Sequence, residues 1–199
     1  MREHLQAIVT VLSLINPVVC GAMFARVEAG RPRDQQVTEA TSAALAIIVI
    51  LVLAALVGTR LLDLFNVSLD AFMVAGGGVL AWMGFSMLSG KGTSPPPDVP
   101  ANSKASLTPL ILFAASPGTI TGVVTLAAAH TRLNFPITAL VAVVIASAVT
   151  WLVMLLVARI GRKDSEGGFA QDTITRFMGL IVLSMGVQFA LTGLHQFWT

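Results

Sequence analysis

Two dipeptides that end in proline lie inside long apolar stretches of the sequence. Together they could form an uncharged binding site. Asn16 precedes Pro17 in the first stretch, and Ser116 precedes Pro117 in the fourth. Asn and Ser are favoured N-caps and proline is favoured at the first helical position, so each pair predicts the junction of two half-helices. Half-helix starts expose N–H donors, and half-helix ends expose carbonyl acceptors. Two such breaks would suit the carboxylate and the ammonium of a small zwitterion.

The residues just after each proline would supply the donors. They are Val18 and Val19 at the first break, and Gly118 and Thr119 at the second. Because Gly118 has no Cβ, a ligand could approach its backbone closely. A single break is more simply interpreted as a proline kink, whereas two breaks at matching depth favour a site. The predicted substrate-binding residues are Asn16, Pro17, Ser116, Pro117, Gly118 and Thr119.

The composition places these breaks in membrane-spanning helices. Hydrophobic residues make up 55% of the 199 residues and charged residues only 11%, and the mean hydropathy is +0.84. Soluble domains are about one quarter charged. The apolar residues form blocks of about 20 residues, the length of a transmembrane helix. The six predicted spans are Leu5–Phe24, Ala43–Leu62, Leu69–Leu88, Leu107–Ala129, Phe135–Val157 and Ile174–Leu194.

A polar segment rich in proline and glycine divides the chain into two halves of three spans each. The predicted units are a first repeat at 1–90, a cytoplasmic linker at 91–106 and a second repeat at 107–199. Ser116-Pro117 follows Asn16-Pro17 by 100 residues. Because each half has an odd number of spans, the second copy must enter the membrane from the opposite side. The predicted fold is an all-α membrane protein with two inverted three-helix repeats, an architecture that many secondary transporters share.

Glycines in the third and sixth spans recur at a helical spacing. Gly77 and Gly84 are seven residues apart, and Gly179 and Gly186 repeat this spacing 102 residues later. Seven residues make nearly two turns, so each pair lies on one helix face. Small residues let membrane helices approach closely, and we therefore predict helix packing rather than substrate contact.

Basic residues in the connecting segments predict the orientation, since cytoplasmic loops carry an excess of Lys and Arg. Of the 12 Lys and Arg residues, nine fall on one side of the predicted spans and three on the other. The larger set is expected in the cytoplasm, which places both termini outside. It contains Arg26, Arg31, Arg33, Lys91, Lys104, Arg159, Arg162, Lys163 and Arg176, and the smaller set contains Arg2, Arg60 and Arg132.

The sequence does not favour several other functional classes. Cys20 is the one cysteine, so the chain lacks the thiol pair of a thiol-transfer protein. No acidic pair lies inside a predicted span, and the chain is not expected to be an enzyme. No glycine-rich loop is followed by Lys-Ser or Lys-Thr, which argues against ATP-driven transport by this chain alone. The formal charge of +2 does not indicate nucleic-acid binding, and neither a metal site nor a cofactor is predicted.

Four segments carry a resemblance to a known family, namely Ile15-Asn16-Pro17 with Phe24 downstream, Ala75-Gly76-Gly77-Gly78, Ser116-Pro117-Gly118-Thr119-Ile120 and Arg176–Leu194. With these segments, and over nearly its whole length, the sequence resembles the MarC/SnatA family of small integral membrane proteins. The sequence departs from the family pattern where Val19 stands in place of an expected glycine, without the usual second proline, and where Ser116 replaces a glycine. The resemblance implies a multi-pass protein of a prokaryotic plasma (inner) membrane, similar to transporters of glycine and alanine.

The leading prediction is a secondary transporter of small neutral amino acids or similar zwitterions in the lipid bilayer, with alternating access around the two breaks. The coupling ion, either proton or sodium, stays open, as do the direction of transport and the oligomeric state. The alternatives are a non-transporting scaffold or partner-binding subunit, and an exporter of another small solute. Folded but inactive Asn16→Leu and Ser116→Ala variants would favour the transporter over the scaffold.

Overall fold

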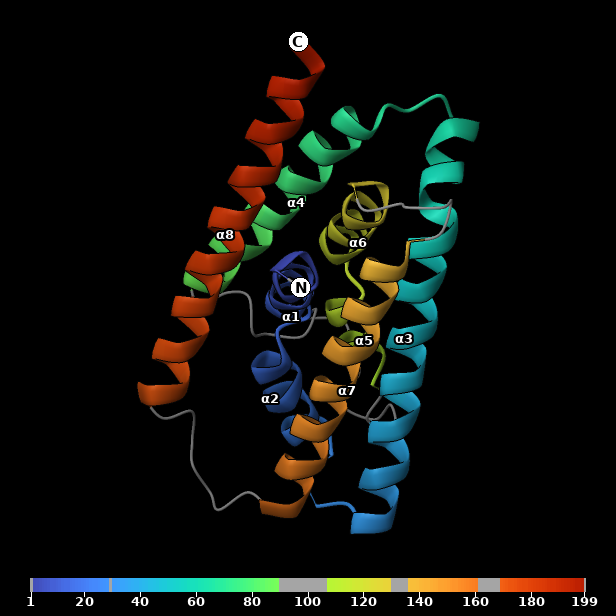
Figure 1. Ribbon diagram of the computed structural model, residues 1–199. Helices are drawn as coiled ribbons and strands as arrows, with labels where there is room; N and C mark the ends of the chain where they lie inside the picture. The colour runs from blue at the N-terminus through green and yellow to red at the C-terminus, as the bar shows by residue number, and fades with distance from the viewer. Residues whose placement is uncertain (1, 29, 90–106, 130–135, 161–168, 199) are drawn as a thin grey trace.

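The computed structural model describes residues 2–28, 30–89, 107–129, 136–160 and 169–198, which form helices and turns with no strand (Figure 1). The helices are α1 (Arg2–Ile15), α2 (Pro17–Val27), α3 (Arg33–Leu64), α4 (Leu69–Leu88), α5 (Thr108–Ala114), α6 (Pro117–Ala129), α7 (Ile137–Ile160) and α8 (Phe169–Trp198). The predicted linker 91–106 lies outside the described residues, as do Arg132, Arg162 and Lys163.

Six helical segments among the described residues are long and apolar enough to cross a membrane. The first, His4–Ala25, covers most of α1 and α2, which Asn16 separates. The fourth, Leu110–Ala129, covers most of α5 and all of α6, which Ala115 and Ser116 separate. The prediction of an all-α membrane protein with six spans, of which the first and fourth are broken, is therefore confirmed. The inverted relation between the two halves stays a prediction.

The second span is longer than the sequence prediction. We expected Ala43–Leu62, whereas α3 is a 32-residue helix that begins at Arg33. Its first three turns are too polar to register as a span, yet they contain no proline or glycine that would stop the helix. Asp34 in the first turn also interacts favourably with the N-terminal end of the helix dipole.

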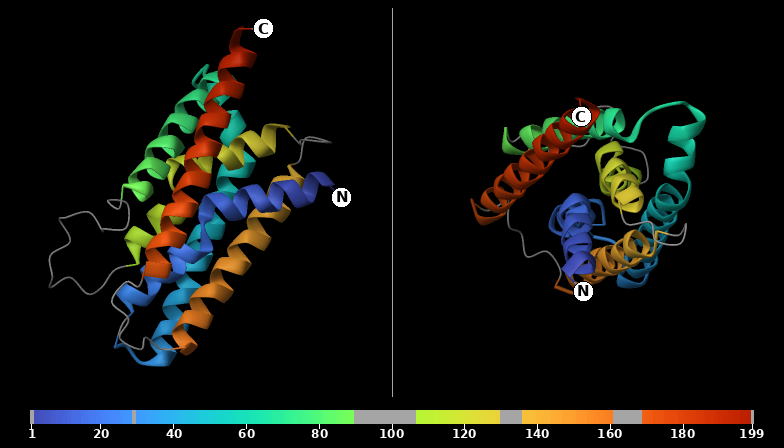
Figure 2. Two further views of the ribbon diagram at one scale, coloured as in Figure 1. Left: turned by 90° about the vertical axis from the view of Figure 1, so that its left-hand side faces the viewer. Right: turned by 45° about the horizontal axis from the view of Figure 1, so that its top comes forward.

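The helices α4 and α8 form a closely packed pair on one side of the molecule (Figures 1 and 2). A Cβ atom on Gly84 would lie 2.6 Å from the carbonyl oxygen of Gly179, and one on Gly179 would lie 2.9 Å from that of Gly84. Such contacts are possible only between glycines, because any side chain would push the two backbones apart. The predicted packing role of the spaced glycines is confirmed.

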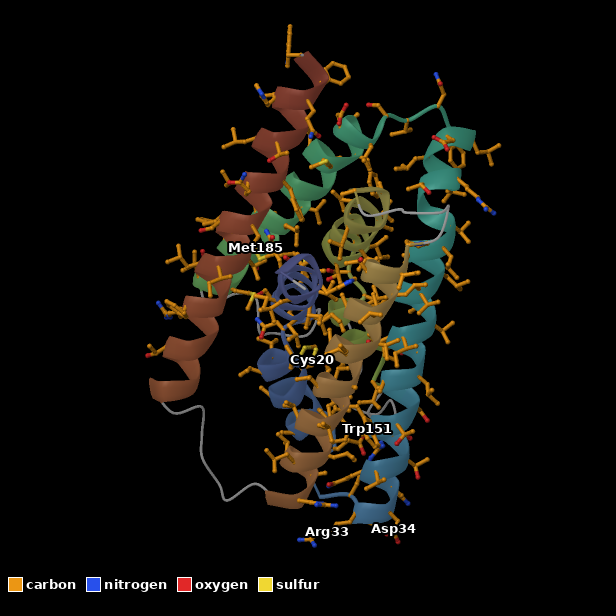
Figure 3. All side chains as sticks on the ribbon, viewed as in Figure 1. Cys20, Arg33, Asp34, Trp151 and Met185 are labelled. Carbon is orange, nitrogen blue, oxygen red and sulfur yellow. The ribbon has the colours of Figure 1, made fainter. Side chains whose placement is uncertain are left out.

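The remaining helices pack around the two broken ones. The unbroken helix α7 contacts α1, α2 and α3, while α1 contacts α6 and α2 contacts α5. The two broken helices therefore pass each other in opposite directions, each half-helix beside a half of the other. Figure 3 shows Trp151 on α7 beside α3, where its Nε1 donates to Thr41 Oγ1 at 3.2 Å.

Candidate substrate site at two helix breaks

Asn16 ends α1 and caps α2 at the first break. Its backbone is left-handed, with φ 53° and ψ 76°, a conformation that Asn tolerates better than most residues. The side-chain Oδ1 accepts a hydrogen bond from the N–H of Val19 at 3.3 Å, and Pro17 occupies the first turn of α2. The predicted N-cap followed by proline is confirmed at this break.

The amide nitrogen of Asn16 is a buried donor without an acceptor. The residue is 3% exposed, and Nδ2 has no hydrogen-bond partner among the described residues. Because the N–H of Val19 requires an acceptor, Oδ1 must face it, and the NH₂ group points the other way. An unpaired buried amide costs about 1–3 kcal/mol. This donor is therefore available to a ligand that reaches the break.

Cys20 donates hydrogen bonds to two carbonyl oxygens at the first break. Its Sγ donates to the carbonyl oxygen of Ile15 at 3.3 Å, and its N–H donates to the carbonyl oxygen of Asn16 at 3.1 Å. Figure 3 shows Cys20 at the centre of the molecule, and its side chain is fully buried. The sequence had suggested free carbonyls here, but the nearest two already accept one hydrogen bond each.

Ser116 caps α6 at the second break in the same way. Its Oγ accepts the N–H of Thr119 at 3.3 Å, and it lies 3.1 Å from Thr119 Oγ1, with which it exchanges a hydrogen bond. Ser116 is 4% exposed and Thr119 is fully buried. The two hydroxyls form a neutral polar pair inside the protein, at the position that the sequence predicted.

Gly118 is buried, and a side chain from α4 covers it. A Cβ atom on Gly118 would lie 2.5 Å from Leu80 Cδ2, so the missing side chain lets α6 pack against α4. Pro117 is exposed and Pro17 is partly exposed, and both residues begin half-helices. The structure thus buries the other four predicted residues, Asn16, Ser116, Gly118 and Thr119, within the protein.

A cavity of about 200 Å³ lies between α1, α6 and α8, on the side of the breaks where α1 begins and α6 ends. None of the six predicted site residues lines it. Its polar wall consists of Gln6, Thr10 and Thr125, and the rest of its lining is Ala7, Gly122, Leu126, Ala129 and Phe189. Sequence reasoning missed this cavity because three helices that are distant in the chain form it, and no local motif marks it.

Comparison with known protein families gives a match over almost the entire chain. The model of the MarC family, described as "MarC family integral membrane protein", matches residues 1–198. The chain belongs to the MarC family. It is 31% identical over 194 residues to a UPF0056 membrane protein of Pyrococcus abyssi, covering 94% of this chain and 91% of the relative. No solved structure matches the chain.

Other MarC-family relatives come from Escherichia coli. The UPF0056 membrane protein YhcE is 24% identical over 189 residues, with 92% of this chain and 87% of the relative covered. The UPF0056 inner membrane protein MarC of strain O1:K1 / APEC is 25% identical over 207 residues, with 95% and 92% covered. The chain is accordingly an integral membrane protein with six candidate spans in its described residues.

Val19, which departs from the expected MarC-family glycine, belongs to the packed interior. It is 4% exposed, and its N–H is the one that Asn16 caps. Ser116, which also replaces a glycine, supplies the cap of the second break and half of its hydroxyl pair. One departure therefore adds apolar volume after the first break, and the other adds polar groups at the second.

Glu28, which follows α2, is a buried carboxylate. Its side chain is 1% exposed, and its Oε1 accepts from Arg31 Nη1 at 2.9 Å, while Oε2 has no partner among the described residues. Burial raises the pKa of Glu28, Arg31 opposes this increase, and Glu39 adds to it. A sequence signal existed, since Arg31 follows Glu28 at the spacing of a helical ion pair.

Proposed function

We propose that this MarC-family protein is a secondary transporter of small neutral amino acids such as glycine and alanine. The observation that carries the proposal is the unpaired Nδ2 of Asn16, buried at a break between two half-helices. A buried donor without a protein acceptor is stabilised by an acceptor from a ligand. A substrate carboxylate is a strong acceptor for such an amide.

The second break supports an uncharged substrate site. The Ser116 and Thr119 hydroxyls can each donate or accept, and neither carries charge. A solute with net charge would leave that charge uncompensated in the membrane, whereas a zwitterion brings both signs itself. Helix ends supply the matching partial charges, as in transporters built from discontinuous helices.

The packing of the helices supports alternating access. α4 and α8 form one closely packed pair, and α3 packs with α7 elsewhere in the molecule (Figure 2). Between them, α6 contacts α4 through Gly118 and Leu80. Relative motion of the α4–α8 pair and the remaining helices would open the breaks to one side at a time.

We further propose that both termini lie outside a prokaryotic inner membrane. Nine of the 12 Lys and Arg residues fall on the opposite side of the spans. A C-terminal alkaline phosphatase fusion would then be active in cells, and a C-terminal green fluorescent protein fusion would be dark. The reverse result would overturn this orientation.

Uptake into proteoliposomes tests the proposed function. Purified protein should take up labelled glycine or alanine with saturable kinetics, and unlabelled alanine should compete. Imposed proton or sodium gradients would then identify the coupling ion. The absence of saturable uptake across a panel of small neutral amino acids would exclude this substrate class.

Two glycine substitutions test the role of Asn16 within that assay. Asn16 and Asn66 both have φ near 53°, a conformation that glycine adopts readily, so both substitutions preserve the backbone. Asn16→Gly removes the unpaired amide and should abolish uptake, whereas Asn66→Gly changes an exposed turn and should leave uptake intact. A scaffold without transport activity would instead give no uptake with either variant or with the wild type.

A further inference from the structure

The cavity between α1, α6 and α8 is separate from the two breaks and has a polar wall of its own. Gln6 and Ala129 at its rim are exposed, while Thr10 and Thr125 line it from α1 and α6. Its volume of about 200 Å³ holds several water molecules at about 30 Å³ each. No charged side chain lines it. Its size and neutrality therefore match a small polar solute.

Thr125 lines the cavity and has a buried hydroxyl without a hydrogen-bond partner among the described residues. Thr121 and Thr150, also on helices, donate to the carbonyl oxygens of Pro117 and Ala146, each four residues earlier, at 2.9 and 2.8 Å. The hydroxyl of Thr125 has no such bond and no other partner among the described residues, although its oxygen is buried. A rotation of the Thr125 side chain toward the cavity would therefore break no hydrogen bond inside the protein.

Leu14 packs against Gly122, one of the residues that line the cavity. It lies two residues before Asn16, and its side chain occupies the space beside Gly122 where a Cβ would be. Phe189 of α8 approaches the same position within 3.4 Å. Leu14 is buried in an apolar cluster with Leu80, the residue that covers Gly118. One group of side chains thus covers both glycines of α6.

We propose that this cavity is a first binding position for a small neutral zwitterion, with Leu14 as the gate between it and the helix breaks. The proposal rests on the proposed transport function. The Thr125 and Thr10 hydroxyls and the Gln6 amide solvate the ammonium and carboxylate of the incoming solute. Movement of Leu14 away from Gly122 then connects the cavity to the unpaired amide of Asn16.

Replacement of Thr125 by valine removes the hydroxyl and retains the shape of the side chain. We expect the KM of uptake to rise roughly three- to tenfold, the equivalent of one hydrogen bond, with unchanged thermal stability. The matched control is Thr150→Val, which removes a buried threonine hydroxyl on α7 that is bonded to its own helix. An unchanged KM in Thr125→Val, or an equal increase in Thr150→Val, would overturn the role of Thr125.

Thiol labelling locates the site independently of transport. Cys20 is the one cysteine of the chain and is fully buried, so the wild type gives the background reaction. A Thr125→Cys variant in proteoliposomes should react with a membrane-impermeant methanethiosulfonate reagent from the side on which α1 begins. Saturating glycine or alanine should slow this reaction at least threefold. If Thr125→Cys fails to fold, Thr10→Cys tests the opposite wall of the same cavity.

The possible outcomes separate the two proposals. The wild type could take up amino acids while Thr125→Cys is not labelled, or is labelled at a rate that no amino acid slows. This result would overturn the cavity site but not the proposed transport function. Protection from labelling without any uptake would support the cavity site and overturn transport of that solute. The absence of both uptake and protection would overturn both.

Discussion

A Cβ atom on Gly77 of α4 would lie 2.5 Å from the carbonyl oxygen of Gly186 on α8. The two helices are therefore in backbone contact at this position. The same relationship recurs seven residues along each helix, between Gly84 and Gly179. Close approach of this kind stabilises membrane helices through van der Waals contact, because lipid offers no hydrophobic driving force for their association. The separation of α4 and α8 thus depends on these four glycines and on Gly193, whose added Cβ would lie 2.6 Å from the carbonyl oxygen of Asp70 on α4.

Gly77→Ala should separate α4 from α8 and destabilise the protein. The added methyl group meets backbone atoms of Gly186 and Ala190, which cannot move as a side chain can, and overpacking of this kind costs about 1–3 kcal/mol. Thermal unfolding in detergent measures the effect. Gly78→Ala is the matched control one residue later, since nothing lies within 4 Å of its added Cβ. Equal melting temperatures for the two variants would contradict the backbone contact.

Thr41→Val should destabilise the contact between α3 and α7. Trp151 Nε1 would lose its acceptor, and an unpaired donor costs about 1–3 kcal/mol when buried; since Trp151 is only partly buried, we expect the lower end. The measurement is thermal unfolding followed by tryptophan fluorescence. Thr38→Val is the control, because Thr38 is exposed and bonds only within α3, to Asp34. A loss of stability as large in the control would exclude the interhelical bond as the cause.

Ser116→Ala should reduce both stability and uptake. It removes the N-cap of α6, a loss of about 1 kcal/mol, and leaves Thr119 without its hydroxyl partner at the second break. Ser68 is also an N-cap, which accepts from Ala71 at the exposed start of α4. Ser68→Ala should therefore lower stability by a similar amount without changing uptake. Parallel melting and uptake assays separate the two effects, and full uptake by Ser116→Ala would contradict a role for this hydroxyl in transport.

Glu28 should make stability depend on pH. Because burial raises its pKa above the ordinary 4.5, the folded protein binds this proton more tightly than the unfolded chain does. The contribution to stability is therefore complete below pH 4.5 and is lost as the pH rises through the higher folded-state value. Glu28→Gln should flatten this part of the profile of melting temperature against pH. A wild-type melting temperature that does not fall as the pH rises through this range, or an equal fall in Glu28→Gln, would contradict the prediction.

The breaks were predictable from the sequence because their signals are local. Asn16 and Ser116 each precede a proline, and the capping bonds they form reach only three residues ahead, to Val19 and Thr119. The sequence signal of a membrane span is also local, since about 20 consecutive apolar residues suffice to identify one. The glycine faces of α4 and α8 were also predictable, because helical periodicity places residues seven apart on the same side.

What could not be predicted depends on which helices become neighbours. Leu80, which belongs to a different span, covers Gly118. The missing Cβ of Gly118 therefore allows helix packing that no sequence pattern predicted. The cavity beside Thr125 needs α8 to bring Phe189 against α1 and α6. Glu28 is buried although charged residues surround it in the sequence. Gln36, eight residues later, donates to the carbonyl oxygens of Glu28 and Arg31, a contact that no local pattern indicates.

The unequal lengths of α3 and α4 determine how the protein fits its bilayer. The 32 residues of α3 extend about 48 Å, whereas the 20 residues of α4 extend about 30 Å, which is also the thickness of a typical hydrocarbon core. α3 is longer than the hydrocarbon core and can still span a thicker membrane by changing its tilt. α4 is only as long as the core of a typical bilayer and cannot span a thicker one. Hydrophobic mismatch therefore acts first on α4, whose end at Ser68 and Asp70 would be drawn toward the acyl chains in a thicker bilayer.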